Sequence, residues 1–305
     1  MLSRVANALY WMGRYLERAE NLTRCLVVTE ELSTEIRAFN EKLAQTEWND
    51  LAVIFPGEVE GTTDLDHLRG FLTASGHPYS VLFSLGKARE NARATREALS
   101  LEVFVTINET YRALEAHASG GLPDHADMRA ALSTTHTGLL SIVGAVEHTL
   151  SRDQGWLFLK LGESLERVYR AAAIMRAKLP ALLAAPPDID IPLYYSQWRS
   201  LLRSLSSLEN YRKLHGAHLE ANAVMEFLLF DPHAPRSIRF GAAAVKTHLE
   251  EISDTRELTP PGRLIGRLHA RLAYSDALVP LPLLDEVQAE LAKTHDAIDL
   301  LYFGT

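Results

Sequence analysis

The sequence is poor in features that would mark several classes of protein. Cys25 is its only cysteine, so neither an internal disulfide nor a cysteine-based metal cluster can form, and a lone thiol suits a reducing compartment. No apolar run approaches the roughly 20 residues that a membrane span needs, and the first residues lack the apolar core of a signal peptide. We therefore expect a cytoplasmic protein with no membrane partner.

Surplus positive charge is also missing. The formal net charge is -8, whereas binding to nucleic acid depends on an excess of basic residues, so we expect no nucleic-acid partner. Only seven of the 31 basic residues are lysine and the other 24 are arginine. Arginine favours bidentate pairing with carboxylates and buried ion pairs, although a GC-rich genome produces the same bias.

The common nucleotide, nucleophile and metal motifs are absent too. Neither GxxxxGK[ST] nor a strand-linked GxGxxG occurs, so we expect no ATP site of those kinds and no cofactor. GxSxG is absent, and Cys25 lies on an apolar helix stripe, which predicts a place in the core. No ExxH occurs, which disfavours a metal-containing helical bundle. His215 and His218 alone resemble surface histidines more than metal ligands.

Helical periodicity fills the segments between the prolines, and no alternating run is long enough to propose a strand. The sequence therefore predicts an all-α fold, a helical bundle of about nine or ten helices in a single domain, 1–305. Ser151 and Gln154 match a capping box at the start of one helix, and AAPPDIDIP after Pro180 predicts a stiff connection. The expected helices cover residues 4–39, 65–74, 80–117, 124–150, 151–179, 193–215, 218–230, 236–252, 262–277 and 284–301, and a shorter apolar stretch lies at 48–55.

Two short patterns each occur twice, in the same order. GxxLER occurs at Gly13–Arg18 and Gly162–Arg167, and ExYRxL occurs at Glu109–Leu114 and Glu209–Leu214. This order suggests an internal duplication with halves at about 1–120 and 150–215, followed by C-terminal helices at 216–305. We expect the four motif helices to meet near the centre of the bundle. Because a mid-helix glycine is unfavourable, Gly13 indicates that another helix backbone passes close by.

The charges beside Gly13 have two interpretations. Arg14, Glu17 and Arg18 would point towards facing helices and form a partly buried ion network. Their expected partners are Glu109, Arg112, Glu209 and Arg212. Such a network can be purely structural, or it can form a site for an acidic ligand.

The turn DPHAP, residues 231–235, is a second candidate site. Arg236 and Arg239 would lie in the first turn of the helix that follows, where they could hold a phosphate or carboxylate. The alternative is that Pro235 merely starts this helix at its preferred first position.

Several segments together resemble the alpha-E family, bacterial all-helical proteins of about this length. They are GRYLERAEN near the start, ARENARATRE at 88–97, QWRSLLRSLSSLENYR at 197–212 and FLLFDPHAPRSIRF at 227–240. The resemblance covers essentially the whole chain. The second GxxLER copy departs from the family pattern because it reads GESLERVY, with Glu163, Val168 and Tyr169, which counts against a strictly two-fold arginine site.

The resemblance implies an association rather than an activity. Genes of the family tend to lie beside, or to be fused to, a circularly permuted ATP-grasp protein, often with a transglutaminase-like protease. We therefore expect a non-catalytic partner of an ATP-grasp ligase that joins a carboxylate to an amine. The alternative is an enzyme with a glutamate base and arginines that bind a substrate carboxylate. The candidate ligand or partner contacts are Arg14, Glu17, Arg18, Glu20, Arg89, Arg93, Glu109, Arg112, Glu166, Arg167, Glu209, Tyr211, Arg212, Arg236 and Arg239.

Overall fold

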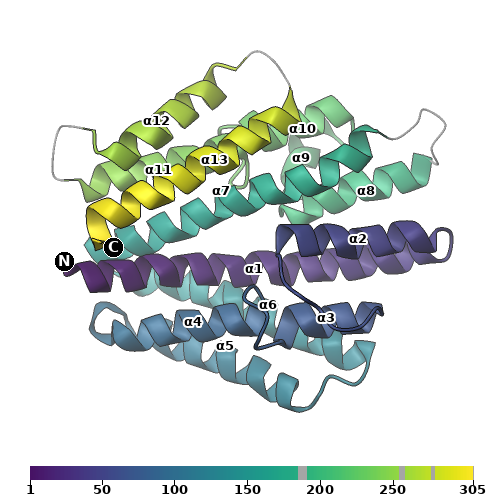
Figure 1. Cartoon of the computed structure of the whole chain (residues 1–305), viewed down its shortest axis with the longest axis horizontal. Coiled ribbons are helices and arrows are strands. Elements are labelled where there is room, and N and C mark those ends of the chain that lie inside the picture. Colours follow the sequence, from purple (N-terminus) through teal and green to yellow (C-terminus); the bar gives the residue numbers. More distant parts are fainter. Residues whose placement is uncertain (185–190, 254–257, 276–278, 305) are drawn as a thin grey trace. The chain divides into compact units, whose positions relative to one another are not determined.

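The computed structural model describes residues 1–184, 191–253, 258–275 and 279–304. Within these ranges the chain is almost entirely helical and has no strand (Figure 1), which confirms the all-α prediction, with somewhat more helices than expected. No helix of these ranges combines the length and apolar character that crossing a membrane requires. The helices are α1 (Ser3–Arg37), α2 (Glu41–Ile54), α3 (Asp64–Thr73), α4 (Val81–Ala94), α5 (Leu101–Ser119), α6 (His125–Thr149), α7 (Gln154–Leu183), α8 (Ile191–Ser204), α9 (Leu208–His215), α10 (Ala221–Phe230), α11 (Ile238–Ile252), α12 (Pro260–Ala273) and α13 (Pro280–Ile298).

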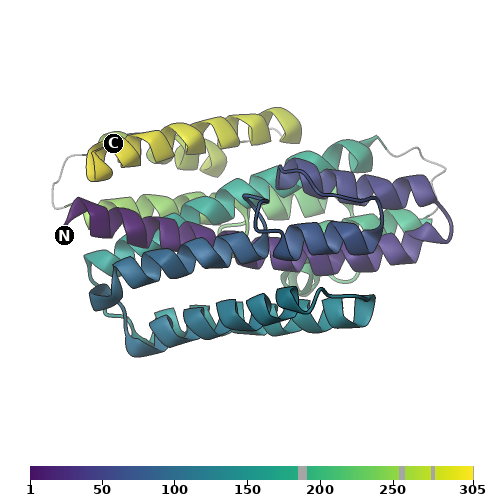
Figure 2. The ribbon, with the colours of Figure 1, turned by 60° about the horizontal axis from the view of Figure 1, so that its bottom comes forward.

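The helices group into two compact units that interleave along the chain. The first unit comprises residues 1–30 and 55–163, and the second comprises residues 31–54 and 164–305. Both α1 and α7 therefore begin in the first unit and continue into the second. In the first unit, α5 packs along α6 as a hairpin (Figure 2). In the second unit, α12 packs against both α11 and α13.

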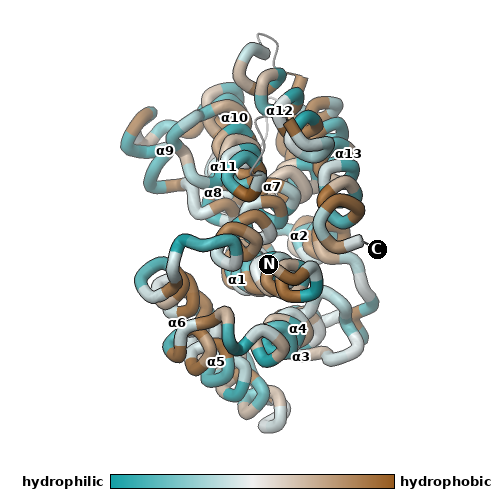
Figure 3. The backbone as a smooth tube through the Cα atoms, turned by 90° about the vertical axis from the view of Figure 1, so that its left-hand side faces the viewer, coloured by the Kyte–Doolittle hydropathy of each residue, from teal (hydrophilic) through white to brown (hydrophobic). Residues whose placement is uncertain are grey.

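The α5–α6 hairpin shows how the sequence pattern produces the core of the first unit. Val103, Ile107 and Leu114 lie on one stripe of α5 and are buried, as helical spacing requires of a face that packs inwards. Leu132 and Leu139 form the corresponding stripe of α6. Hydrophobic residues accordingly lie along both helices in Figure 3, where the backbone is coloured by hydropathy.

Two of the predicted long helices are divided. The predicted helix 80–117 breaks after Ala94, and α5 begins anew where the Ser100 side chain accepts a hydrogen bond from the Val103 amide at 3.2 Å. The predicted helix 193–215 breaks at Ser206, whose φ of 48° is left-handed. In both places the hydrophobic period runs across the break. Periodicity alone therefore could not reveal either division, although a serine cap is a known start signal.

The two ends of α7 also correct the prediction. Asp153, not Ser151, caps its start, because the Asp153 carboxylate accepts hydrogen bonds from the Gly155 and Trp156 amides at 2.8 and 3.1 Å. Pro180 lies inside the helix rather than after it. It stands in the last turn, where a missing amide proton removes only one hydrogen bond close to the helix end. The predicted stiff connection after Pro180 lies largely outside the described residues.

Candidate functional site

Gly13 on α1 and Gly162 on α7 mark the place where the two GxxLER helices cross. A Cβ atom on Gly13 would overlap the carbonyl oxygen of Leu159 and lie 3.0 Å from the Glu163 amide nitrogen. A Cβ atom on Gly162 would overlap the carbonyl oxygen of Tyr10. Each glycine thus lies against the residue three positions before the other, so the contact is reciprocal. The predicted close approach of a helix backbone at Gly13 is confirmed.

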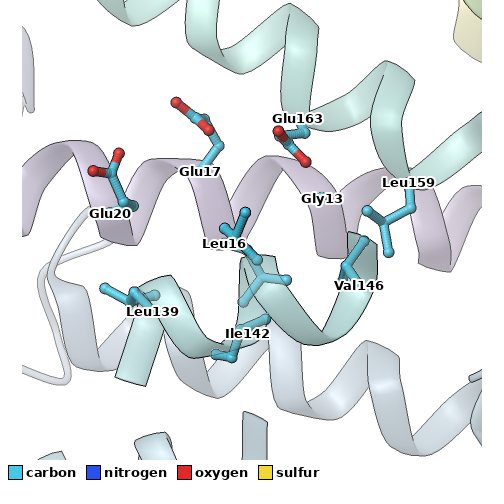
Figure 4. Close-up of a pocket in the computed structure, with 10 residues that line it drawn as sticks. Gly13, Leu16, Glu17, Glu20, Leu139, Ile142, Val146, Leu159 and Glu163 are labelled. Carbon is cyan, nitrogen blue, oxygen red and sulfur yellow. The ribbon is translucent and has the colours of Figure 1, made fainter. Parts of the chain in front are cut away.

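A small cavity lies beside this crossing (Figure 4). It leaves about 20 Å³ for water, which is room for roughly one molecule. Three glutamates line it, Glu17 and Glu20 on α1 and Glu163 on α7, and in Figure 4 the carboxylates of Glu17 and Glu20 point away from the apolar side chains of α6. Its other lining residues are Gly13, Leu16, Leu139, Ile142, Val143, Val146 and Leu159. The cavity is therefore too small for a substrate.

The carboxylates on α1 are buried and held by neighbours on the same helix. Glu17 accepts a hydrogen bond from the Asn21 side-chain amide at 2.6 Å, and Glu20 forms an ion pair with Arg24. Arg24 also donates to the Asn21 side-chain oxygen at 2.7 Å. All four side chains are at least nine-tenths buried, so they form one compensated polar chain, as buried charge requires.

Glu163 belongs to a second ion network in the first unit. Lys160 forms ion pairs with Glu163 at 2.7 Å and with Glu147 at 2.9 Å, and Arg152 pairs with Glu147 at 2.9 Å. Burial raises the pKa of Glu147, but the hydrogen bonds and charges of Lys160 and Arg152 outweigh it and hold that pKa below its ordinary value. Glu147 therefore stays ionised and keeps Lys160 in place beside Glu163.

The motif arginines of the first copy are covered by aromatic rings. The guanidinium carbon of Arg14 lies 4.9 Å from the Trp11 ring centroid. That of Arg18 lies 5.2 Å from Tyr15 and 5.1 Å from Tyr79. Both arginines are more than nine-tenths buried. These cation–π contacts hold both guanidinium groups against aromatic rings.

The second GxxLER copy is built differently. Glu166 is 0% exposed and its carboxylate accepts a hydrogen bond from Arg170 at 2.9 Å. Arg170 also donates to the carbonyl oxygen of Ile54 at 2.7 Å, whereas the motif residue Arg167 is half-buried. Arg170 occupies the position that Asn21 holds in the first copy, so the two copies do not form a symmetric pair of arginine sites.

The predicted ion pairs between the two kinds of motif are wrong. Glu109 and Arg112 are exposed, because α5 turns its buried stripe of Val103, Ile107 and Leu114 to the opposite side. Glu209 and Arg212 instead form an exposed ion pair with each other at 3.1 Å. Within the first unit, Glu109 and Arg112 therefore complete no buried network with Arg14, Glu17 and Arg18.

Three further candidates have separate surroundings. Arg89 donates to the Asn108 side chain at 2.8 Å and lies over the Tyr111 ring at 4.7 Å, whereas Arg93 is exposed. Tyr211 is buried and stacks on His215 with ring centroids 4.6 Å apart. The two ExYRxL copies therefore use their tyrosines differently.

The DPHAP turn stops α10 and starts α11, but not as predicted. The N-cap is Ser237, whose hydroxyl accepts a hydrogen bond from the Phe240 amide at 3.0 Å, so Pro235 precedes the helix rather than opening it. Arg236 also precedes the cap, and Arg239 is the second helical residue. Arg239 donates to the carbonyl oxygen of Phe230 at 3.3 Å. Its guanidinium therefore helps to close α10, and anion binding here stays a prediction.

Neither motif pattern pointed to the residues that complete the buried clusters. Asn21 and Arg170 each stand four residues after a motif glutamate, on the same helix face, and this spacing could have identified both. No such spacing marked Tyr79, which lies in a loop, or Lys160, which lies outside the motif. Among the described residues, no group of three or more His, Cys, Asp and Glu side chains is placed to hold a metal ion.

Comparison with known proteins identifies relatives of this chain. The model of the Alpha-E family, described as a predicted alpha-helical domain with a conserved ER motif, matches residues 1–303. Uncharacterized proteins of Mycobacterium bovis and Mycobacterium tuberculosis are 25% identical over 322 aligned residues, which cover 95% of this chain. The chain spans only 34% of the length of these curated relatives. No solved structure matches the chain.

Proposed function

Because the chain belongs to the Alpha-E family, we propose that it is a non-catalytic helical partner of an ATP-grasp ligase that joins a carboxylate to an amine. It would dock on the ligase or hold the peptide substrate, with a transglutaminase-like protein as a further partner. The proposal places the chain in the cytoplasm, where ATP is available. The length of the mycobacterial relatives supports a modular role, since about two thirds of each lies outside the matched region.

The observation that supports a non-catalytic role is that the GxxLER crossing leaves no room for a substrate. An active site needs space for a reacting atom near its catalytic groups. The cavity beside Glu17, Glu20 and Glu163 has room for about one water molecule, and the buried side chains around it pair with one another. Such an arrangement supports a scaffold whose interior is fixed and whose surface makes the contacts.

The rival proposal is an enzyme that uses one of these glutamates as a general base. The specific observation in its favour is that three glutamates from two helices line one cavity. It would require the cavity to open, because a general base must come within hydrogen-bond reach of the proton that it removes.

Affinity purification of the tagged chain from its native cells tests the two proposals, with mass spectrometry of every retained component. Recovery of an ATP-grasp ligase in stoichiometric amount supports the partner proposal. Glu109 and Arg112 are both exposed, so charge-reversing substitutions there leave the core intact. The Glu109→Arg, Arg112→Glu double variant is compared with Glu251→Gln on α11. A solitary chain that carries a small molecule or a metal contradicts the partner proposal and supports an independent site.

A further inference from the structure

An open cleft in the second unit lies where the end of α10 and the turn that follows it meet α11 and the end of α12. Its volume is about 400 Å³, which is within the range of small-molecule sites. It is far larger than the cavity at the GxxLER crossing. Apolar side chains and charges of both signs line it together, namely Phe227, Phe230, Leu272, Glu226, Asp231 and Arg239.

Local hydrogen bonds fix the turn on the acidic side of the cleft. The Asp231 carboxylate accepts hydrogen bonds from the His233 and Ala234 amides at 2.7 and 2.9 Å. The Ser237 hydroxyl, which caps α11, donates to the carbonyl oxygen of Asp231. Because these bonds join the end of α10 to the start of α11, the two walls of the cleft are held in place.

The α11 wall of the cleft carries positive charge. The Arg239 guanidinium donates to the carbonyl oxygen of Phe230 at 3.3 Å, but it forms no ion pair with another described residue. His269 on α12 responds to this charge. Burial lowers the pKa of His269, and the charges of Lys246 and Arg239 lower it further, while Glu250 opposes them. Arg239 therefore presents a positive charge that a neutral carbonyl does not compensate.

Glu226 gives the α10 wall a negative charge. Its side chain is exposed and forms no ion pair with another described residue, Arg239 included. Glu226 and Phe230 are four residues apart on α10, so their Cβ atoms lie about 5–6 Å from each other on one helix face. Arg239 contacts the carbonyl oxygen of Phe230. The two opposite charges are therefore separated by roughly one or two helical turns, about 5–11 Å.

A ligand with charge of only one sign does not suit this cleft. A phosphate would be repelled by Glu226 and Asp231, and a simple cation would be repelled by Arg239. A free amino acid carries an ammonium group and a carboxylate on one carbon. With a hydrogen bond of about 2.9 Å at each end, it spans a gap of this size. Its side chain would meet Phe230 and Leu272, which favours an apolar or aromatic side chain.

We propose that this cleft binds a free α-amino acid with an apolar or aromatic side chain. Arg239 pairs with the carboxylate, Glu226 pairs with the ammonium group, and Phe230 contacts the side chain. The terminus of a peptide offers only one of the two charges beside its side chain, so it fits less well. The inference goes beyond the ligase proposal and does not rest on it, because the site uses no contact with a partner.

Nitrogen-15 NMR of the full chain with L-phenylalanine tests the site. The titration follows the amides of residues 226–239 and 272–273, together with the Nε–H group of Arg239. We expect saturable shifts of these signals. L-Phenylalaninamide lacks the carboxylate and N-acetyl-L-phenylalanine lacks the ammonium group, so each should bind at least about fivefold more weakly than L-phenylalanine.

Two variants each remove one of the paired charges. Arg239→Gln keeps a donor for the Phe230 carbonyl but loses the positive charge, so it should bind L-phenylalanine about tenfold more weakly. Glu226→Gln should bind it about fivefold more weakly. The matched controls are Arg263→Gln on α12 and Glu251→Gln on α11, which are exposed and lie outside the lining of the cleft. Both controls should bind as the parent does.

Four results would overturn the proposal. They are an absence of saturable shifts at millimolar L-phenylalanine, shifts that leave the cleft residues unmoved, a capped ligand that binds as tightly as the free amino acid, and equal affinities of Glu226→Gln and Glu251→Gln. Glu226 is exposed, so its substitution keeps the fold and decides the matter even where Arg239→Gln unfolds. A failed ligase purification would leave this measurement unaffected.

Discussion

Gly13 and Gly162 lie in each other's backbone groove, so that neither position can carry a side chain without moving a helix. Both glycines open a GxxLER pattern, and the glutamates of both patterns are buried with partners from their own helices. The repeated pattern is therefore explained first by packing: a small residue that lets two helices cross closely, followed by a buried glutamate that must be compensated.

The crossing predicts the effect of adding one methyl group at these positions. Gly13→Ala and Gly162→Ala should each lower the free energy of unfolding by about 1–3 kcal/mol or more, because the new Cβ atom meets a carbonyl oxygen rather than a flexible side chain. Gly144→Ala on α6 is the control, since nothing lies near its Cβ position, and there alanine should add about 1 kcal/mol. Urea titration monitored by circular dichroism measures all three. Equal changes at the three sites would contradict the close crossing.

Arg170 offers a test of the buried ion pair in the second copy. Arg170→Ala removes the hydrogen bond and the positive charge that Arg170 gives to the buried Glu166 carboxylate, so we expect a loss of about 3–5 kcal/mol in the free energy of unfolding. The exposed Arg267→Ala on α12 should change it by less than about 0.5 kcal/mol.

A double variant separates the effect of the ion pair from the effect of side-chain volume. Glu166→Leu combined with Arg170→Met removes both charges and keeps the bulk, so it should recover much of the lost stability. Thermal unfolding of the single and double variants measures this. If the double variant is no more stable than Arg170→Ala, the pair is not the reason for the loss.

Hydrophobic period and proline placement were enough to predict an all-α fold, and the predicted helix start at Asp124 lies one residue before the start of α6. The breaks at Ser100 and Ser206 were missed, because the apolar stripe continues through them and only a serine cap or a left-handed residue marks each one. At Pro180 the error is the reverse, because the sequence predicted a helix end where α7 continues. A proline in the last helical turn removes too little bonding to end the helix.

The candidate site was predicted in part. Burial of Arg14, Glu17, Arg18 and Glu20 follows from their place beside a packing glycine. The assumption that recurring motifs must meet failed for Glu109 and Arg112, since the hydrophobic stripe of α5 decides which way its charges face.

Arg18 distinguishes a structural role from a binding role. Its guanidinium carbon lies 5.2 Å from the Tyr15 ring centroid and 5.1 Å from that of Tyr79, and the side chain is almost fully buried, so Arg18→Ala should lower the free energy of unfolding by about 2–4 kcal/mol. The exposed Arg93→Ala in the same unit is its control. A stable Arg18→Ala protein that no longer retains its partner would show that the structural interpretation of Arg18 is wrong.

Asp50 on α2 predicts a pH dependence of stability in the second unit. Burial raises its pKa from 3.8 to about 6, with Lys178 opposing the shift and Glu47 adding to it. Between these two pKa values the folded chain binds more protons at Asp50 than the unfolded chain, so this residue's contribution to stability falls as the pH rises from about 4 to about 6. At neutral pH the ionised carboxylate is therefore destabilising.

Asp50→Asn removes that ionisation. At pH 7.5 the variant should be more stable than the parent by about 1–2 kcal/mol, after allowance for solvent screening, and the gain should vanish below about pH 4, where both side chains are neutral. Urea midpoints measured across this range give the difference directly. Glu251→Gln, an exposed carboxylate of the same unit, should show no such dependence. A gain that stays constant with pH would mean that Asp50 titrates as an ordinary surface aspartate.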